Sequence, residues 1–395
     1  MTVRVRRLGA EDASASQRLE WEAFGVPTTD PGPSELVKPG SHGWGAVDGD
    51  RLLAQAVDHE YDAWFGGRVL PVAGIGDVTV GAEERGRSVL GPLLVALLEG
   101  ARERGAVMST LFPTAPRIYR RTGYEVVAAT RRVDVPSAAL SALPPTPGVV
   151  LRRAGLEDAE TVRRLYDTWA AGVDGALTRR GVSFSATDAE LVAASTGVTL
   201  AEDAAGEVLG YAAWTRGPGD GTRPELSVAD LVATRADAYV PLLRMLGTFS
   251  SVAATVRIRS SGDDLVRLLL PTTHWTTAGE DLYMLKVLDV EAAFTGAGCA
   301  PGLALRSGFT LAGDVLADLD GSYAVVADAG RISCVRAPAG DDRTLNPRGL
   351  ALLVTGAAPC RDLRVLGLLT GGNPAEDADW DALVAGRVRG VLDHF

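Results

Sequence analysis

Apolar and polar positions between residues 77 and 124 predict a strand, a polar loop, a helix and a second strand. Residues 78–80 are β-branched or small and stop at a glycine, as strands do at turns. Residues 89–104 carry leucines at helical spacing, and a glycine follows to end the helix. Residues 106–111 predict the next strand, and the loop at 83–88 contains two arginines and one glycine.

The junction between this strand and this helix has the composition of an anion site. The N–H groups in the first turn of a helix have no partner within the helix, and the helix dipole favours negative charge there. Arg85 and Arg87 add positive charge suited to phosphate oxygens. A solvated turn has a similar composition, so the loop alone does not decide between the two readings.

Two segments that are 151 − 5 = 146 residues apart begin alike. Residues 5–13 read VRRLGAEDA and residues 151–159 read LRRAGLEDA, with six of nine positions identical. Each predicts a strand, a glycine turn and an acidic helix start. Residues 44–57 and residues 199–214 each predict two strands joined by a turn. Residues 77–80 and residues 230–233 each predict a strand that precedes a helix containing Pro-Leu-Leu. The pattern predicts two copies of one fold.

The second copy differs from the first where an anion would bind. Its loop at 234–239 has no glycine and no paired arginines, and it contains an aspartate, so we expect no pyrophosphate site there. Residues 136–148, rich in proline and small residues, predict an exposed connector between the copies. The proline-rich loop at 28–33 is either a substrate-binding segment or an ordinary surface loop.

The last part of the chain, residues 284–395, predicts a third unit with short strands and helices. Its expected elements are a helix at 291–294, strands at 309–312, 322–327 and 332–336, apolar stretches at 350–354 and 363–366, and a closing helix at 382–392.

Two motifs of the first copy resemble the GNAT acyltransferase family. The run from Arg85 to Leu90 resembles the Arg/Gln-x-x-Gly-x-Gly/Ala turn that opens the helix holding the pyrophosphate of acetyl-CoA. Tyr119, with Gly123 and Tyr124 after it, resembles the Tyr-x-x-x-Gly-Phe/Tyr motif. Ser88 and Leu90 stand where glycines are usual. One branch of the family has leucine at the position of Leu90. For Ser88 two effects are open: its Cβ crowds the pyrophosphate, or its hydroxyl donates to a phosphate oxygen.

The whole chain is similar to the enhanced-intracellular-survival acetyltransferases. The resemblance implies mixed α/β sheets in a GNAT domain (1–143), a degenerate second GNAT domain (148–283) and a sterol-carrier-protein-like domain (284–395). It implies acetyl transfer from acetyl-CoA to primary amines of cationic substrates such as aminoglycosides, polyamines or lysine side chains, by direct attack through a tetrahedral intermediate. It also implies a homo-oligomer, a hexamer.

The resemblance also implies roles for residues. The expected cofactor-binding residues are Arg85, Gly86, Arg87, Ser88, Val89 and Leu90, mainly through backbone N–H groups, with Val78 and Val80 beside the pantetheine arm. The N–H of Val78 is the expected oxyanion donor, and Tyr119 is the expected acid for the leaving thiolate. The terminal carboxylate of Phe395 is expected to anchor the amine and accept its proton, with His394 as a possible contributor. Packing roles for Tyr119 and Phe395 are the alternatives.

Charge and composition narrow the function further. The net charge of −11 argues against a nucleic-acid partner and suits cationic substrates, although acidity also serves solubility. The hydrophobic share of 46% indicates a globular chain. No run of about 18 apolar residues predicts a membrane span, and the N-terminal residues show no signal peptide, so we expect a cytoplasmic protein. Three scattered cysteines predict neither a disulfide framework nor a metal site.

Two other functions remain open from the sequence. One is a dedicated acyltransferase of secondary metabolism with a single acceptor. The other is a non-catalytic protein that binds a lipid or small ligand on a GNAT scaffold. Binding of coenzyme A would distinguish an acetyltransferase from the non-catalytic binding protein. A panel of acyl donors and amines would distinguish an acetyltransferase of broad specificity from the dedicated acyltransferase.

Overall fold

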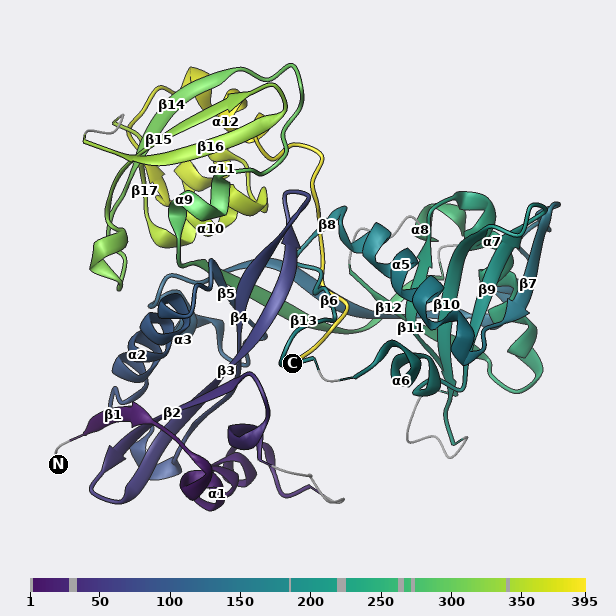
Figure 1. Cartoon of the computed structure of the whole chain (residues 1–395), viewed down its shortest axis with the longest axis horizontal. Coiled ribbons are helices and arrows are strands. Elements are labelled where there is room, and N and C mark those ends of the chain that lie inside the picture. Colours follow the sequence, from purple (N-terminus) through teal and green to yellow (C-terminus); the bar gives the residue numbers. More distant parts are fainter. Residues whose placement is uncertain are drawn as a thin grey trace.

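The chain folds into three parts with the C-terminus at their centre (Figure 1). This computed structural model describes residues 3–27, 34–184, 186–218, 225–261, 266–270, 274–338 and 342–395. The predicted proline-rich loop at 28–33 lies outside these residues. The elements of the first part are β1 (Arg4–Arg7), α1 (Ala13–Phe24), β2 (Ser41–Asp48), β3 (Arg51–Phe65), β4 (Arg68–Val80), α2 (Leu90–Glu103), β5 (Met108–Leu111), α3 (Pro116–Arg120) and β6 (Glu125–Pro136).

The second and third parts follow in chain order. The second contains α4 (Ser137–Ser141), β7 (Val149–Arg153), α5 (Ala159–Ala170), β8 (Val173–Asp174), α6 (Asp188–Ala193), β9 (Gly197–Asp203), β10 (Val208–Arg216), β11 (Leu226–Ala233), α7 (Ala236–Gly247), β12 (Thr255–Ser260), α8 (Val266–Leu269) and β13 (Thr276–Val287). The third contains α9 (Val290–Phe294), β14 (Leu305–Leu311), β15 (Gly321–Asp328), β16 (Arg331–Ala337), β17 (Thr344–Leu345), α10 (Pro347–Thr355), α11 (Cys360–Val365), β18 (Leu369–Thr370), α12 (Asp377–Ala382) and β19 (Val388–Arg389).

One sheet of twelve strands runs through the first two parts, in the order β1-β2-β3-β4-β5-β13-β6-β12-β11-β10-β9-β7. Each part contributes six strands in the same order, with one parallel pair, β4–β5 in the first and β11–β12 in the second. The two parts exchange their last strands. β13 lies between β5 and β6, and β6 pairs with β12. Each half of the sheet is therefore completed by a strand from the other half.

Matching ion pairs confirm the predicted repeat. In the first copy Arg6 forms hydrogen bonds of 2.8 Å with both carboxylate oxygens of Asp12, which accepts the N–H of Gly9 at 3.1 Å. In the second copy Arg152 forms bonds of 2.6 and 2.8 Å with Asp158, which accepts the N–H of Gly155 at 2.9 Å. The pairs are 146 residues apart, as the sequence match requires. An equivalent turn therefore starts the first helix of each copy.

The third part has its own sheet, in the order β16-β15-β14-β17-β18, and its helices lie on one face of it (Figure 1). Buried charges attach it to the first copy. Lys286 of β13 and Asp314 form an ion pair of 2.6 Å with both side chains 1% exposed. Arg348 of α10 contacts Glu125, which also binds Arg120 beside the predicted catalytic Tyr119. The third part thus packs against the segment that carries Tyr119.

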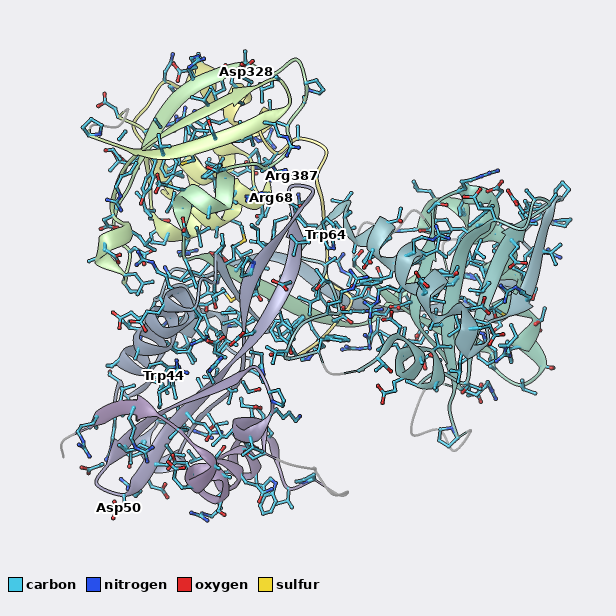
Figure 2. All side chains as sticks on the ribbon, in the orientation of Figure 1. Trp44, Asp50, Trp64, Arg68, Asp328 and Arg387 are labelled. Carbon is cyan, nitrogen blue, oxygen red and sulfur yellow. The ribbon has the colours of Figure 1, made fainter. Side chains whose placement is uncertain are left out.

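The hairpin of β3 and β4 reaches the third part at its tip, where Arg68 and Arg387 lie close together (Figure 2). Arg68 donates two 2.8 Å hydrogen bonds to the carbonyl oxygens of Ala292 and Ala293. Arg387, at the start of the C-terminal tail, donates to the carbonyl of Gly298 at 2.9 Å. The tail therefore leaves the third part from a fixed point.

Two predictions about the chain path are wrong. The connector at 136–148 is not exposed throughout, because Leu140 of α4 and Leu143 just after that helix are at most 2% exposed. The predicted closing helix at 382–392 does not form. α12 ends at Ala382, Gly386 adopts a left-handed φ of +79°, and β19 pairs with β8 instead. β13 runs from Thr276 to Val287 and so spans residue 283, the expected end of the second domain, and that limit stays a prediction.

Candidate active site

The strands β4 and β5 separate at the centre of the first copy. Their parallel pairing ends at Ile75 and Leu111, while β4 continues to Val80 along β3. An irregularity in the β3–β4 register falls here, and Asp77 adopts a left-handed φ of +49°. The N–H of Gly81 donates to β3. Because N–H directions alternate along a strand, those of Val78 and Val80 face the side that β5 has left.

The loop after β4 turns into α2 through two left-handed residues. Gly86 has a φ of +80° and Ser88 a φ of +60°, so Ser88 occupies a conformation that favours glycine. Val89 precedes α2 as its N-cap, and no described side chain caps that helix. The first turn of α2 therefore has the uncapped N–H groups that an anion site requires, and the pyrophosphate site itself stays a prediction.

The two arginines of this loop are exposed, but they differ in their partners. Arg85 donates from Nε to the carbonyl of Val80 at 3.4 Å, next to the open edge of β4. Arg87 donates to Glu84 at 3.3 Å, and Glu84 also binds Arg51 at 2.6 Å. Arg85 therefore lies nearer to the open edge, while part of the charge of Arg87 is balanced by Glu84.

A cavity of about 910 Å³ opens where β4 and β5 separate. It brings together three predicted residues that are far apart in sequence, Val78, Tyr119 and Phe395, and also His394. The sequence did not predict most of the other residues that line the cavity. These include Phe24, Lys38, Ser41, His59, Tyr61, Asp77, Phe112, Glu280 and Asp281. The exchanged strand β13 supplies the last two, and no local pattern in the sequence announces that exchange.

Tyr119 lies on the short helix α3 and is 6% exposed. Burial raises the pKa of its hydroxyl to about 12, so the phenol stays protonated across the physiological range. Tyr124 packs beneath it, fully buried, with its hydroxyl 2.5 Å from that of Ser109. Of the two tyrosines, Tyr119 is the one that lines the cavity.

Phe395 ends the chain inside the cavity wall. Its ring centroid lies 5.0 Å from that of Tyr61 and 5.3 Å from that of Phe112. Gly74 of β4 makes room for both rings, since a Cβ there would stand 2.7 Å from Phe395 and from Tyr61. His394 stacks on Phe112 at 4.1 Å, and burial lowers the pKa of its imidazole.

The tail reaches this position through backbone contacts with both copies. The N–H of Gly390 donates to Asp174 at 3.0 Å in the second copy. Thr130 of β6 donates to the carbonyl of Val391 at 2.7 Å, and Arg259 of β12 donates to that of Leu392 at 2.7 Å. The C-terminal residues are therefore held by contacts with β6, β8 and β12.

Three carboxylates are among the residues that line the cavity. Asp77, Glu280 and Asp281 line it. Glu280 accepts a hydrogen bond from Arg131 at 2.6 Å, and Asp281 accepts one from Arg132 at 2.5 Å. The hydrogen bond from Arg132 lowers the pKa of Asp281, which keeps that group ionised.

Metal and membrane features are not found in the described parts of the chain. Among the described residues, no group of three or more His, Cys, Asp or Glu side chains could hold a metal ion. No helix in the described ranges is both long and apolar enough to cross a membrane.

Comparison with known proteins shows to which class of protein the chain belongs. Two profiles of the GNAT acetyltransferase domain match, one over residues 4–127 and the other over residues 175–287. The first range contains β4 and β5, which separate at the cavity, and the second contains the exchanged strand β13. The chain has two GNAT domains and is a GNAT-type acetyltransferase. A search of curated proteins by sequence found no match.

Solved structures share the architecture over the full chain. A GCN5-related N-acetyltransferase from Kribbella flavida is 28% identical, with a TM-score of 0.84 over 100% of this chain and 98% of that one. One from Anabaena variabilis is 21% identical, with a TM-score of 0.85 over 100% of both chains. Eis1 from Mycobacterium abscessus is 19% identical, with a TM-score of 0.76 over 99% of this chain and 100% of that one. The last two show likeness of fold alone.

Ser88 provides a test of the cofactor loop. We expect Ser88→Val to raise the KM for acetyl-CoA about 10-fold, because a β-branched residue at this φ is strained by roughly 1–2 kcal/mol. Ser88→Gly should bind acetyl-CoA at least as well as the native chain, and the KM for the amine should not change in either variant. Equal acetyl-CoA affinity in both variants would separate this turn from the cofactor.

Gly74 provides a test of the position of Phe395. Gly74→Ala should displace the rings of Phe395 and Tyr61, and we expect the kcat/KM for the amine to fall about 10- to 100-fold. Acetyl-CoA affinity should stay within about twofold, because the cofactor loop is not touched. Gly302→Ala is the matched control, since nothing lies within 4 Å of a Cβ at that position. An unchanged kcat/KM in Gly74→Ala would show that the position of Phe395 does not matter.

Proposed function

We propose that the chain transfers the acetyl group of acetyl-CoA to a primary amine of a cationic substrate. The observation that carries the proposal is the convergence of Val78, Tyr119 and the C-terminal Phe395 on one cavity, at the open edge of β4. The proposed acceptors are aminoglycosides, polyamines or lysine side chains.

The proposed cofactor site is the junction of β4 and α2. The turn from Arg85 to Leu90, with the uncapped first turn of α2, offers N–H groups and positive charge to the pyrophosphate. The open N–H groups of Val78 and Val80 would bind the pantetheine amides as an added strand would. This places the thioester beside Tyr119 and Phe395 in the proposal.

Attack by the amine nitrogen on the thioester carbonyl carbon forms the new C–N bond and moves the carbonyl electrons onto oxygen. The N–H of Val78 is the proposed donor to that oxyanion. The carbonyl then re-forms, and the C–S bond breaks with its electron pair going to sulfur. The Tyr119 hydroxyl is the proposed donor to that sulfur. Because a phenol whose pKa is about 12 is a weaker acid than a thiol of reference pKa about 8.5, full transfer of its proton to the thiolate is uphill, and its hydrogen bond to the sulfur carries most of the stabilisation.

The proposed role of Phe395 is carried by its terminal carboxylate. A carboxylate of reference pKa about 3.5 is a weak base, so it would attract the ammonium group and pass its proton on through water. Asp77, Glu280 and Asp281 line the same cavity. Although Glu280 and Asp281 are paired with Arg131 and Arg132, carboxylate oxygens can accept further hydrogen bonds, which supports a cationic acceptor. The net charge of −11 would also favour approach of such a substrate.

The other parts have proposed roles of their own. We propose a degenerate second GNAT copy, because α7 begins after a loop without glycine, where Arg235 pairs with Asp237 in its first turn. The domain limits 1–143, 148–283 and 284–395, the sterol-carrier-like character of the third domain, the hexamer and the cytoplasmic location also remain proposals. They rest on the resemblance and on the sequence.

Thiol release from acetyl-CoA with a panel of polyamines, aminoglycosides and lysine peptides tests the proposal. Tyr119→Phe should lower kcat about 10²- to 10⁴-fold, the usual contribution of a positioned acid. A chain extended by a few residues beyond Phe395 should lose activity on a similar scale. Tyr124→Phe is the control, because that buried hydroxyl faces Ser109 rather than the cavity, and its kcat should change less than about threefold.

Three outcomes would contradict parts of this account. Full activity in the extended chain would remove the terminal carboxylate from the mechanism. Full activity in Tyr119→Phe would remove the acid. Turnover with one neutral amine and none with cationic amines would replace the proposed substrate class with a dedicated acceptor.

A further inference from the structure

A buried charge network lies between the second GNAT copy and the C-terminal tail. The guanidinium of Arg179 donates from Nε to both carboxylate oxygens of Asp393, at 2.9 and 3.1 Å. Its two other nitrogens donate to the carboxylate of Asp230 on β11, at 2.5 and 2.8 Å. The three side chains are only 9–14% exposed, so one arginine links two buried carboxylates.

Two tyrosines complete this network. The hydroxyl of Tyr211 donates to Asp230 at 3.0 Å. The hydroxyl of Tyr166 lies 3.2 Å from Asp393 and 2.8 Å from the carbonyl of Leu177, and its ring stacks under the guanidinium at 4.0 Å. Both tyrosines are at most 2% exposed. Asp393 is thus held by an arginine and a tyrosine that both belong to the second copy.

Arg179 is itself held in an uncommon conformation. Its φ is +54°, a left-handed value that side chains other than glycine rarely adopt. The segment before it is fixed to β3 of the first copy, where Thr178 donates to the carbonyl of Asp62 at 2.8 Å and Trp64 donates to that of Ala176 at 2.8 Å. The backbone that presents Arg179 to the tail is therefore fastened on the first copy.

Asp393 lies two residues before the end of the chain. Two residues span at most about 7 Å, so fixing Asp393 restricts where the terminal carboxylate can go. The rings of His394 and Phe395 pack on Phe112 in the cavity wall. The charged side chain of Asp393 therefore fixes the tail, and the rings of His394 and Phe395 orient the C-terminus.

We propose that Arg179, with Asp230 and Asp393, positions the C-terminal residue at the acceptor side of the acetyl-transfer site. The second GNAT copy then serves as a clamp on the tail. This inference rests on the proposed function, in which the terminal carboxylate handles the amine. Arg179 is a positioning residue, because it acts through Asp393 and does not line the cavity of Phe395.

The variant Asp393→Asn tests the clamp with the least disturbance, because Arg179 keeps its pairing with Asp230. We expect its kcat/KM for the amine to fall about 10-fold or more, with acetyl-CoA affinity within about twofold of native. Asp377→Asn is the matched control. Asp377 is likewise a partly buried carboxylate bound by arginine, in its case Arg343 and Arg364, but it lies on α12 of the third part. Its kinetics should match the native chain.

A second measurement does not depend on activity. Carboxypeptidase A removes aromatic residues from a free C-terminus, so the release of Phe395 reports how firmly the tail is held. We expect slow release from the native chain and Asp377→Asn, and release at least about 10-fold faster from Asp393→Asn and Arg179→Lys. Equal release from all four chains would overturn the clamp, whatever their activity.

The two measurements separate the clamp from the proposed function. Fast release of Phe395 from Asp393→Asn, with no acetyl transfer by the native chain, would leave the clamp standing and reject the proposed function. In the chain extended beyond Phe395, Asp393→Asn should cause no further loss of kcat, because both changes act through the same carboxylate. A further loss of kcat in the extended chain would show that Asp393 does not act through the terminal carboxylate. That result would overturn the proposed positioning role of Arg179 and Asp393.

Discussion

Reciprocal exchange of the last strands, β6 and β13, is the constraint on which the rest of the molecule depends. Since β13 lies between β5 and β6, and β6 pairs with β12, the two GNAT copies share one sheet. The exchange fixes the second copy against the first and carries Glu280 and Asp281 into the wall of the first cavity. It also provides the surface over which the tail runs back from the third part (Figure 1).

The cavity of about 910 Å³ is consequently assembled from three parts of the chain. The first copy supplies the open edge of β4 and Tyr119, the exchanged strand supplies carboxylates, and the end of the chain supplies Phe395. The third part braces the segment next to Tyr119 through Arg348 and Glu125. In the proposed mechanism the site uses a chain terminus that has to be held in place, and this would give the proposed degenerate second copy a structural role.

Local patterns in the sequence predicted the elements whose causes are local. The β4–α2 junction, the repeated start of each copy and the strands of the third part follow from periodicity, glycines and β-branched residues. The closing helix at 382–392 was wrong because pairing with β8 and the left-handed Gly386 outweigh its apolar spacing. The cavity wall at Phe112 and the network of Arg179 could not be predicted, because their partners come from distant segments whose register is set only by the folded sheet.

A crystal structure of the chain with coenzyme A and an amine that it acetylates would show whether the thiol lies at Tyr119 and the amine at the C-terminal residue. The account predicts the pyrophosphate on the first turn of α2 and the sulfur within hydrogen-bond reach of the Tyr119 hydroxyl. It also predicts the amine nitrogen on the Phe395 carboxylate, directly or through one water. A sulfur remote from Tyr119, or an amine bound away from the chain terminus, would contradict it.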